Sequence, residues 1–448
     1  MTLSFGTDGV RGIAHSELTT KYVQLFGRAA SEEFEGCSWL VGRDTRESSL
    51  QLSKSLANGL ASTRGEVFDL GVVPTPLVAA ASKIEEMPAV MVSASHNIWS
   101  DNGLKIFGPG GIKLSDNCQS SIEERLKNLL ETESEEISEQ QATPYLEPDA
   151  DYLRSLVLSL EGRDLRGQRI VIDCANGAAS QIAPEVFLAL KADLIVINAE
   201  PDGRNINAGC GSNQPRMLQE KVLATKSDLG LALDGDADRL IAVSSDGAVV
   251  DGDQMLCLFA TDFASRDLLE SRAVVVTVMS NMGLLRSMAE NNIRVEQTLV
   301  GDRNVLAAMN EQGIELGGEQ SGHIIFGKHS TTGDGILSGV LLADLMKRRG
   351  GDTVAIAASA MKRHPQVLIN VAVSGMRIDV EKVFAQEIMN ATSKLKDTGR
   401  VLVRASGTEP IVRVMVEAET EETATSVAMA LAHEIENHVI GPLPKPGY

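Results

Sequence analysis

The sequence has little cysteine, few aromatic residues and no long hydrophobic run. No stretch of about eighteen apolar residues is present, so we expect no membrane-spanning helix. The start of the chain lacks the basic and apolar segments of a secretory signal, so no signal peptide is expected. The five cysteines are scattered and form no Cys-x-x-Cys pair: Cys37, Cys118, Cys174, Cys210 and Cys257. This argues against a disulfide framework or a zinc site and predicts a reducing, cytoplasmic location.

Positive charge is also scarce, since 41 Lys and Arg face 61 Asp and Glu and the net charge is −20. An acidic surface repels nucleic acids and anionic membranes, so neither is expected as a partner. A small anionic substrate remains compatible, because it responds to local Arg and Lys. The sequence is also compatible with a homodimer, but it does not fix the oligomeric state. The length of 448 residues predicts about three domains or more.

Through most of the chain, short apolar stretches predict strands that end in loops of small polar residues. Helical patterns separate several of these strands, which makes neighbouring strands parallel. This order occurs in three consecutive blocks, so we predict three similar α/β domains with mixed, mostly parallel sheets at 1–150, 151–252 and 253–363. From His364 the order becomes strand–helix–strand–strand–helix, which predicts an α+β domain at 364–448.

The predicted strand at 89–92 stops at Ser93-Ala94-Ser95-His96-Asn97. Ligands bind at the carboxyl ends of strands in open α/β sheets, so Ser95 is a candidate nucleophile, although a turn or a helix N-cap would also explain these residues. Neighbours in an extended segment point to opposite sides, so we expect His96 to be a poor base for Ser95. No Gly-x-Ser-x-Gly motif surrounds the serine either. A serine that carries phosphate fits better than a hydrolase.

Three aspartates, Asp234, Asp236 and Asp238, follow the predicted buried strand at 228–233. Carboxylates this close repel one another unless a cation is present, and their oxygens suit Mg²⁺. An EF-hand is excluded, because Arg239 stands where glycine is needed and Ser245 where glutamate is needed. A solvated acidic turn is the remaining alternative.

Three further loops carry polar groups. The first is Arg404-Ala-Ser-Gly-Thr-Glu-Pro-Ile-Val-Arg413, whose exposed amides, hydroxyls and arginines suit a phosphate, although a hairpin turn would explain its centre. The second follows a strand predicted at 313–316 and reads Gly317-Gly-Glu-Gln-Ser-Gly-His323, which suits sugar hydroxyls or a simple polar turn. The third, Phe5-Gly-Thr-Asp-Gly-Val-Arg-Gly12, lacks the strand and spacing of a nucleotide-binding fingerprint and contributes Arg11.

Together these motifs resemble those of the α-D-phosphohexomutase family. The resemblance rests on five segments that occur in order along the whole chain: 5–12, 93–97, 234–239, 318–323 and 404–410. It implies four domains around a central cleft, one Mg²⁺ per chain, a sugar bisphosphate as activator, and exchange of phosphate between two positions of a hexose phosphate. Gln320 and Gly301-Asp302-Arg303 resemble the branch that acts on glucosamine phosphates, and the alternative is a mutase of glucose or mannose phosphates.

The resemblance also implies a role for individual residues. Ser95 would be the phosphoserine and would complete a Mg²⁺ site held by Asp234, Asp236 and Asp238. Three residues would serve proton transfer and charge stabilisation, with the base left open: Arg11, Lys105 and His323. Three would lie against the substrate or the phosphoserine: Arg239, Glu319 and Ser321. The substrate's own phosphate would be bound by Arg404, Ser406, Gly407, Thr408 and Arg413.

Two positions depart from the family pattern. Ile98 replaces the usual proline after Ser-His-Asn, which frees φ and predicts a looser loop with altered but retained activity. Ala237 replaces the commoner glycine between the aspartates and is expected to disfavour a positive φ. Two alternatives of another class stay open: a metal-dependent phosphatase, and a sugar-phosphate-binding regulator with a crippled site.

Overall fold

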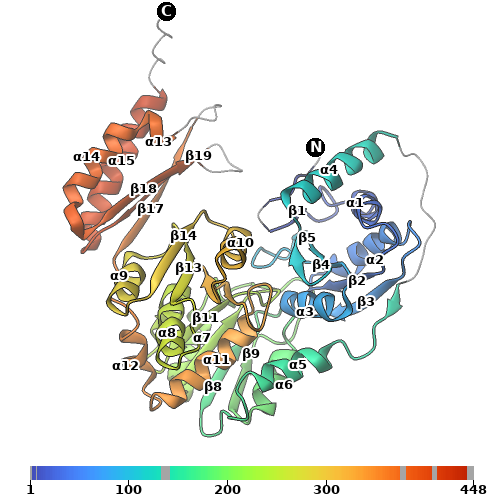
Figure 1. Cartoon of the computed structure of the whole chain (residues 1–448), viewed down its shortest axis with the longest axis horizontal. Coiled ribbons are helices and arrows are strands. Elements are labelled where there is room, and N and C mark those ends of the chain that lie inside the picture. Colours follow the sequence, from blue (N-terminus) through green and yellow to red (C-terminus); the bar gives the residue numbers. More distant parts are fainter. Residues whose placement is uncertain (1–2, 7, 133–141, 374–379, 406–410, 441–448) are drawn as a thin grey trace, which may run out of the picture. The chain divides into compact units, whose positions relative to one another are not determined.

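The computed structural model describes residues 3–6, 8–132, 142–373, 380–405 and 411–440. The chain forms two compact units, one of Met1–Met279 with Asn291–Ala360 and one of Ser280–Glu290 with Met361–Tyr448. Figure 1 traces the chain through both. Across the described ranges, no helix combines the length and the apolar character needed to cross a bilayer.

The first unit begins with a seven-stranded sheet in the order β1-β5-β4-β2-β3-β7, with β6 paired to β5. Strands β4, β2, β3 and β7 are parallel, whereas β1, β5 and β6 add antiparallel pairings at the other edge. Its strands are β1 (Val10–Ile13), β2 (Trp39–Arg43), β3 (Val67–Val72), β4 (Ala89–Val92), β5 (Asp101–Gly108), β6 (Ile112–Lys113) and β7 (Thr143–Pro144). Its helices are α1 (Thr20–Glu33), α2 (Ser49–Leu60), α3 (Thr75–Glu85) and α4 (Asp116–Thr132).

The apolar face of this sheet is covered by α1, α2 and α4, which share one hydrophobic core with its central strands. Trp39 and Phe26 are among its largest fully buried side chains. Such burial is the main source of folding free energy, at about 25 cal/mol per Å² of apolar surface. The opposite surface meets α3, whose Val78 lies against Gly42 of β2. The sheet is therefore a rigid base for the loops at its edge.

A second sheet has the order β12-β11-β10-β8-β9, and a third has the order β14-β13-β15-β16. The second contains β8 (Arg169–Asp173), β9 (Asp193–Ile197), β10 (Leu229–Leu233), β11 (Leu240–Ser244) and β12 (Val249–Val250). The third contains β13 (Ala273–Thr277), β14 (Arg294–Thr298), β15 (Leu316–Gly318) and β16 (Ile324–Phe326). The helices around them are α5 (Asp149–Leu158), α6 (Ile182–Ala189), α7 (Arg216–Thr225), α8 (Gly252–Ser265), α10 (Asp302–Gln312), α11 (Gly335–Arg348) and α12 (Thr353–Ala358).

The three sheets share one topological feature. In each, parallel strands end at a single connection that reverses direction into an antiparallel strand: β4 to β5, β10 to β11, and β15 to β16. These connections contain the Ser95 loop, the three aspartates and the segment 319–323. The predicted similarity of three α/β domains with mixed sheets is thus confirmed, and the candidate loops occupy the same position in each.

The second unit is an antiparallel sheet, β17-β19-β18, covered by helices. It contains β17 (Gln366–Ala372), α13 (Val380–Val383), α14 (Ala385–Leu395), a 3-10 turn (Lys396–Thr398), β18 (Arg400–Ala405), β19 (Ile411–Glu417) and α15 (Glu421–Ile440). This is the predicted α+β order. Helix α9 (Met282–Glu290) joins it, since the Met282 amide donates to the Glu417 carboxylate at 3.1 Å.

Two local predictions were wrong. The Gly-rich N-terminal segment does contain a strand, β1, which pairs with β5 through the register Arg11↔Gly103. The strand expected at 313–316 begins at Leu316 and includes both glycines, because β16 pairs with them in register. Long-range pairing decides both cases, and neither segment has the β-branched alternation of an isolated strand. Strands β11 and β12 form an antiparallel hairpin, with Gly247 at φ 85° in the segment that joins them.

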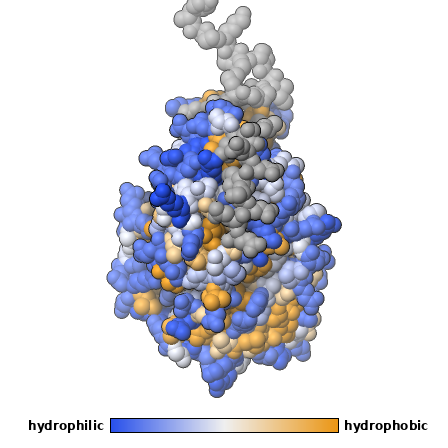
Figure 2. Space-filling model, turned by 90° about the vertical axis from the view of Figure 1, so that its right-hand side faces the viewer, coloured by the Kyte–Doolittle hydropathy of each residue, from blue (hydrophilic) through white to orange (hydrophobic). Residues whose placement is uncertain are grey.

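Hydrophilic residues cover most of the face seen in Figure 2, with hydrophobic residues in patches between them. Several apolar side chains are exposed along the described surface, among them Leu146 at 85 % and Ile98 at 65 %. Scattered exposure of this kind is usual for globular proteins and by itself marks no site.

Candidate active site

The Ser95 hydroxyl donates a 2.7 Å hydrogen bond to Asp234 Oδ2, so the first two candidate loops meet. Ser95 is fully buried and has φ 53°, a left-handed conformation that costs a non-glycine residue about 1–2 kcal/mol. Its amide is held by the Ser93 hydroxyl at 2.9 Å. Backbone strain of this kind persists where the surrounding structure determines it strongly, which is common at functional sites.

The close approach of the two loops depends on Gly235. A Cβ atom at that position would lie 2.5 Å from the Ser95 carbonyl oxygen, which is closer than a Cβ atom can approach a backbone oxygen. Asn207 completes the junction, because its side-chain amide donates to the carbonyl oxygens of Ser95 and Asn97 at 2.9 and 3.0 Å.

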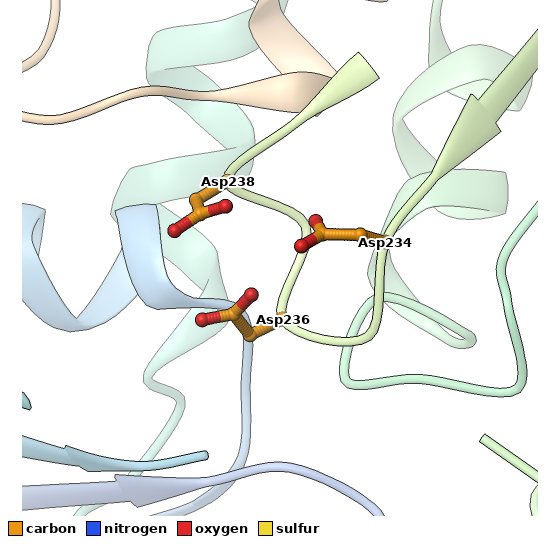
Figure 3. Close-up of side chains that lie close together, drawn as sticks. All are labelled: Asp234, Asp236 and Asp238. Atoms are coloured by element: carbon orange, nitrogen blue, oxygen red, sulfur yellow. The ribbon is translucent and has the colours of Figure 1, made fainter. Parts of the chain in front are cut away.

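The three aspartates converge as predicted, with carboxylate oxygens within 4.8 Å of one another (Figure 3). All three are buried. Two of their oxygens, Asp236 Oδ1 and Asp238 Oδ1, accept no hydrogen bond within the described part of the chain. Burial raises the pKa of Asp234 well above its usual range, and the charges of Asp238 and Asp236 add to this effect. Buried carboxylate oxygens without donors fit a hard divalent cation such as Mg²⁺.

Ala237 lies between these aspartates at φ 57°. Alanine disfavours this conformation, by about 1–2 kcal/mol, so the surrounding loop must impose it. The conformation is held by its neighbours, since the Ala237 amide donates to Asp234 and the Gly335 amide donates to the Ala237 carbonyl oxygen at 2.9 Å.

Lys105 contributes a buried ammonium group to the same cluster. Its Nζ lies 2.7 Å from Asp236 Oδ2, 2.9 Å from Asp238 Oδ2 and 2.9 Å from Asp8 Oδ2. Burial alone would lower the pKa of Lys105, but the three carboxylates outweigh it and raise that pKa well above its usual value. Lys105 therefore stays charged at neutral pH and partly balances the acidic cluster.

His96 does not point away from Ser95, which corrects the expectation drawn from an extended segment. Its Nδ1 lies 3.3 Å from Ser95 Oγ, because the positive φ of Ser95 turns the chain. Burial, with the charges of Arg239 and Arg11, lowers the pKa of His96 to about 4. The imidazole is thus neutral at pH 7 and can exchange a hydrogen bond with the serine oxygen.

His323 and Arg11 also lie at this cluster. His323 Nδ1 is 3.7 Å from Asp238 Oδ1, and the Gly333 amide donates to its Nε2 at 3.0 Å. Burial opposes charge on His323, yet Asp238 raises its pKa. Arg11 is paired with Asp8 at 2.5 Å. The four residues expected in catalysis therefore lie in one connected cluster of side chains around the aspartates: Ser95, Arg11, Lys105 and His323.

The loop predicted to bind sugar, residues 317–323, contains buried polar groups without a hydrogen-bond partner among the described residues. Ser321 Oγ and Gln320 Nε2 are buried and have no hydrogen-bond partner among the described residues. Glu319 Oε1 accepts from the Gly301 amide at 3.1 Å. The buried Nε–H groups of Arg239 and Arg11 likewise donate no hydrogen bond there. Free donors of this kind suit a ligand rich in oxygen, such as a sugar phosphate.

In the second unit, Arg404 and Arg413 are direct partners in the register of β18 and β19. Burial and the charge of Arg413 lower the pKa of Arg404. Two like charges on adjacent strands repel each other, and a bound anion such as a phosphate would relieve this repulsion. Ser406, Gly407 and Thr408 lie outside the described residues.

The sequence did not single out several residues of the cluster. Lys113 Nζ bonds to Asp8 Oδ1 at 2.8 Å and forms an ion pair with Asp302, so β6 of the first sheet contacts the start of α10 here. Thr75 Oγ1 donates to Asp236 Oδ2 at 2.6 Å. No sequence motif marks Lys113, which lies in the two-residue strand β6. Asp8 and Asp302 do lie within motifs of the sequence, the segment 5–12 and Gly301-Asp302-Arg303.

Comparison with known proteins agrees with this geometry. Models of phosphoglucomutase/phosphomannomutase match four segments of the chain: alpha/beta/alpha domain I at 2–133, domain II at 150–247, domain III at 251–364 and the C-terminal domain at 368–434. The chain belongs to this family. It is therefore an enzyme of the phosphohexomutase class.

Two relatives illustrate the closeness of the family match. A phosphoglucosamine mutase of Macrococcus caseolyticus is 44 % identical over 444 residues, covering 97 % of this chain and 99 % of the relative. A phosphoglucosamine mutase of Thermobifida fusca is 45 % identical over 451 residues, covering 98 % and 99 %.

Solved phosphohexomutase structures share the fold at lower identity. A phosphoglucomutase/phosphomannomutase family protein of Burkholderia thailandensis superposes with a TM-score of 0.79 at 24 % identity, over 96 % of this chain and 97 % of the other. An N-acetylphosphoglucosamine mutase of Aspergillus fumigatus, solved with GlcNAc-6P and magnesium, gives 0.71 at 18 % identity, over 98 % and 96 %.

Proposed function

We propose that this phosphohexomutase is a phosphoglucosamine mutase, which interconverts glucosamine 6-phosphate and glucosamine 1-phosphate for amino-sugar biosynthesis. The observation that carries the mechanism is the 2.7 Å contact between Ser95 Oγ and Asp234 within a buried cluster of three aspartates. The choice of glucosamine is supported by relatives about 44 % identical over nearly the whole chain.

In the proposed reaction, phosphate passes from Ser95 Oγ to the free hydroxyl of the sugar phosphate. The phosphorus–oxygen bond to Ser95 breaks, a bond to the sugar oxygen forms, and the hydroxyl proton moves to a base. The bisphosphate then reorients and returns its other phosphate to Ser95 by the reverse step. Positioning and charge stabilisation supply most of the catalysis in such transfers.

The aspartates would hold one Mg²⁺ per chain, with a phosphate oxygen on Ser95 as a further ligand. When bound, the ion would neutralise charge that develops on the transferring phosphate. The residues of the chain suit this role, because Asp236 Oδ1 and Asp238 Oδ1 have no other donor among the described atoms. Magnesium accompanies the sugar phosphate in the A. fumigatus structure.

The other groups have distinct proposed roles. Lys105, Arg11 and His323 would stabilise charge and move the hydroxyl proton. Arg239 would lie beside the phosphoserine, and Glu319 and Ser321 would bind sugar hydroxyls. The substrate's own phosphate would be bound by Arg404, Arg413 and the intervening segment with Ser406, Gly407 and Thr408.

Several further proposals rest on the sequence. A sugar bisphosphate would act as activator, because a dephosphorylated Ser95 must first receive phosphate. The protein would act in the cytoplasm on a small sugar phosphate, without nucleic acid or membrane partners. A homodimer is compatible with these proposals, and gel filtration with light scattering would measure the mass.

The decisive experiment compares kcat/KM for glucosamine, glucose and mannose 6-phosphates with the wild-type protein and Mg²⁺. We expect glucosamine 6-phosphate to give the highest value by at least about tenfold, which corresponds to 1.4 kcal/mol. A higher kcat/KM for glucose or mannose 6-phosphate would assign the protein to the mutases of glucose or mannose phosphates. Steady release of inorganic phosphate without isomerised sugar would indicate a phosphatase, and absence of both products would indicate a regulator.

A further inference from the structure

Arg46 makes four hydrogen bonds to the Ser95 loop, although no motif pointed to it. Its guanidinium is fully buried at the start of the segment after β2. Nη2 donates to the carbonyl oxygens of Ser95 and Asn97 at 2.9 and 3.0 Å. Nη1 donates to those of Asp101, at 3.1 Å, and Ile98. One side chain therefore binds four carbonyl oxygens of the loop.

The buried carboxylate of Asp44 balances the charge of Arg46 and also binds the loop directly. Asp44 Oδ2 accepts from Arg46 Nε at 2.8 Å and from the Ser93 hydroxyl at 2.6 Å. The Ser93 oxygen in turn accepts from the Ser95 amide. Arg46 and Asp44 thus hold both the carbonyl oxygen and the amide of the residue whose φ is 53°.

The second domain supplies a further clamp on the same atoms. Asn207 donates to the carbonyl oxygens of Ser95 and Asn97, the two that Arg46 Nη2 also binds. The segment around Arg46 is itself joined to that domain, because Thr45 Oγ1 donates to Asn176 O at 2.6 Å and the Glu47 amide donates to Gly203 O at 2.8 Å. The loop is fixed from both sides.

We propose that Arg46 is a positioning residue that orients phospho-Ser95 and so directs its phosphate to the sugar instead of water. This inference rests on the proposed function. Transfer to a sugar hydroxyl and transfer to water break the same bond at Ser95 Oγ, but only the sugar is held in place. Phosphoryl transfer depends on alignment, and a displacement of about 1 Å can reduce the rate about 10²-fold. A looser loop therefore lowers the rate of phosphate transfer to the sugar more than the rate of hydrolysis.

The test uses Arg46→Lys, which keeps the buried charge but loses the planar fork that binds several carbonyl oxygens. Its matched control is Arg43→Lys, since Arg43 is in β2 and its guanidinium pairs with Asp69 of β3 at 2.8 Å. Asn207→Gly is the second variant, because glycine removes the amide and tolerates the φ of 57° at that position.

Two quantities are measured on the full-length protein with Mg²⁺: inorganic phosphate released per sugar isomerised, and loss of phosphate from Ser95 without sugar, followed by intact-protein mass spectrometry. We expect Arg46→Lys to lower kcat by about 10²-fold with KM changed by less than about threefold, and to raise the phosphate-to-isomer ratio at least about tenfold. Asn207→Gly should raise that ratio as well, and Arg43→Lys should leave it unchanged.

An unchanged ratio in both variants would overturn the inference, even if kcat or thermal stability fell. If Arg46→Lys does not fold, Asn207→Gly alone decides, and a wild-type ratio again overturns it. Failure of the proposed function is distinguishable, because it appears in the wild type as a lack of glucosamine phosphate turnover. Phosphate loss from Ser95 without sugar would still report on the loop.

Discussion

Ser95 Oγ lies 2.7 Å from Asp234 Oδ2, although 139 positions separate the two residues. The contact joins equivalent loops of two similar domains, each at the point where parallel strands give way to an antiparallel one. The proposed phosphoserine and the acidic cluster that would hold its metal are thus brought together by repetition of one topology.

Ser95→Ala should abolish turnover while the fold is retained. Loss of a nucleophile removes the covalent step, so we expect kcat to fall by at least about 10³-fold. Circular dichroism and thermal unfolding should match those of the exposed control Ser16→Ala. Turnover at the wild-type rate would rule out phospho-Ser95.

Asp236→Asn should remove the response to Mg²⁺. A ligand that binds only the folded state raises stability by RT ln(1 + [L]/Kd), so Mg²⁺ should raise the Tm of the wild type without any substrate. The variant loses one charged ligand and should show little shift and little activity. Asp267→Asn, at a highly exposed carboxylate, is the control. If Mg²⁺ raises the Tm of all three proteins equally, Asp236 is not a ligand of the ion.

Arg413→Gln should weaken substrate binding more than it slows chemistry. A hydrogen bond to a charged group is worth about 1.5–3 kcal/mol, so KM should rise about 10- to 100-fold. Steady-state kinetics with the exposed variant Lys394→Gln as control measure the effect. An unaltered KM would contradict the phosphate site.

Asp334→Asn should make stability less sensitive to pH. Burial raises the pKa of Asp334 from 3.8 to about 6, despite hydrogen bonds from the Leu337 amide and the Tyr152 hydroxyl. The folded protein therefore keeps a proton that the unfolded chain loses, and this contribution to the free energy of unfolding declines as pH rises from about 4 to 6.

Asparagine can keep the cap on α11 without a charge. Relative to the wild type, the variant should thus gain up to about 3 kcal/mol between pH 4 and pH 7, since one pKa unit is worth 1.36 kcal/mol. Urea unfolding at both pH values measures the difference. A constant difference would show that Asp334 has an ordinary pKa.

Ile98→Pro should change kcat by less than about threefold, since most exposed substitutions have small effects. The side chain at 98 is 65 % exposed, and the loop is held through its carbonyl oxygens, which proline retains. The looser loop expected from the missing proline is therefore offset by Arg46 and Asn207. A gain above tenfold would show that residue 98 limits the reaction.

Sequence reasoning predicted the fold class and most of the candidate site because these are local properties. Hydrophobic periodicity reports which segments pair and pack, and small polar residues after a strand mark a loop. Ser95, Asp234 and Lys105 were found in this way or through the family resemblance, and the structure gathers them. The strand β1 was missed, because its pairing with β5 depends on residues about 90 positions away.

The sequence by itself determined which functional groups are available to the site: a serine loop, an acidic cluster, a polar sugar loop and an arginine pair. Only the tertiary structure decided how these groups are held and charged. The left-handed φ of Ser95 turns His96 toward it, burial raises the pKa of Asp234, and Arg46 binds carbonyl oxygens contributed by a different part of the chain. Backbone carbonyls are common to all residues, so no sequence pattern can show which of them a distant arginine will bind.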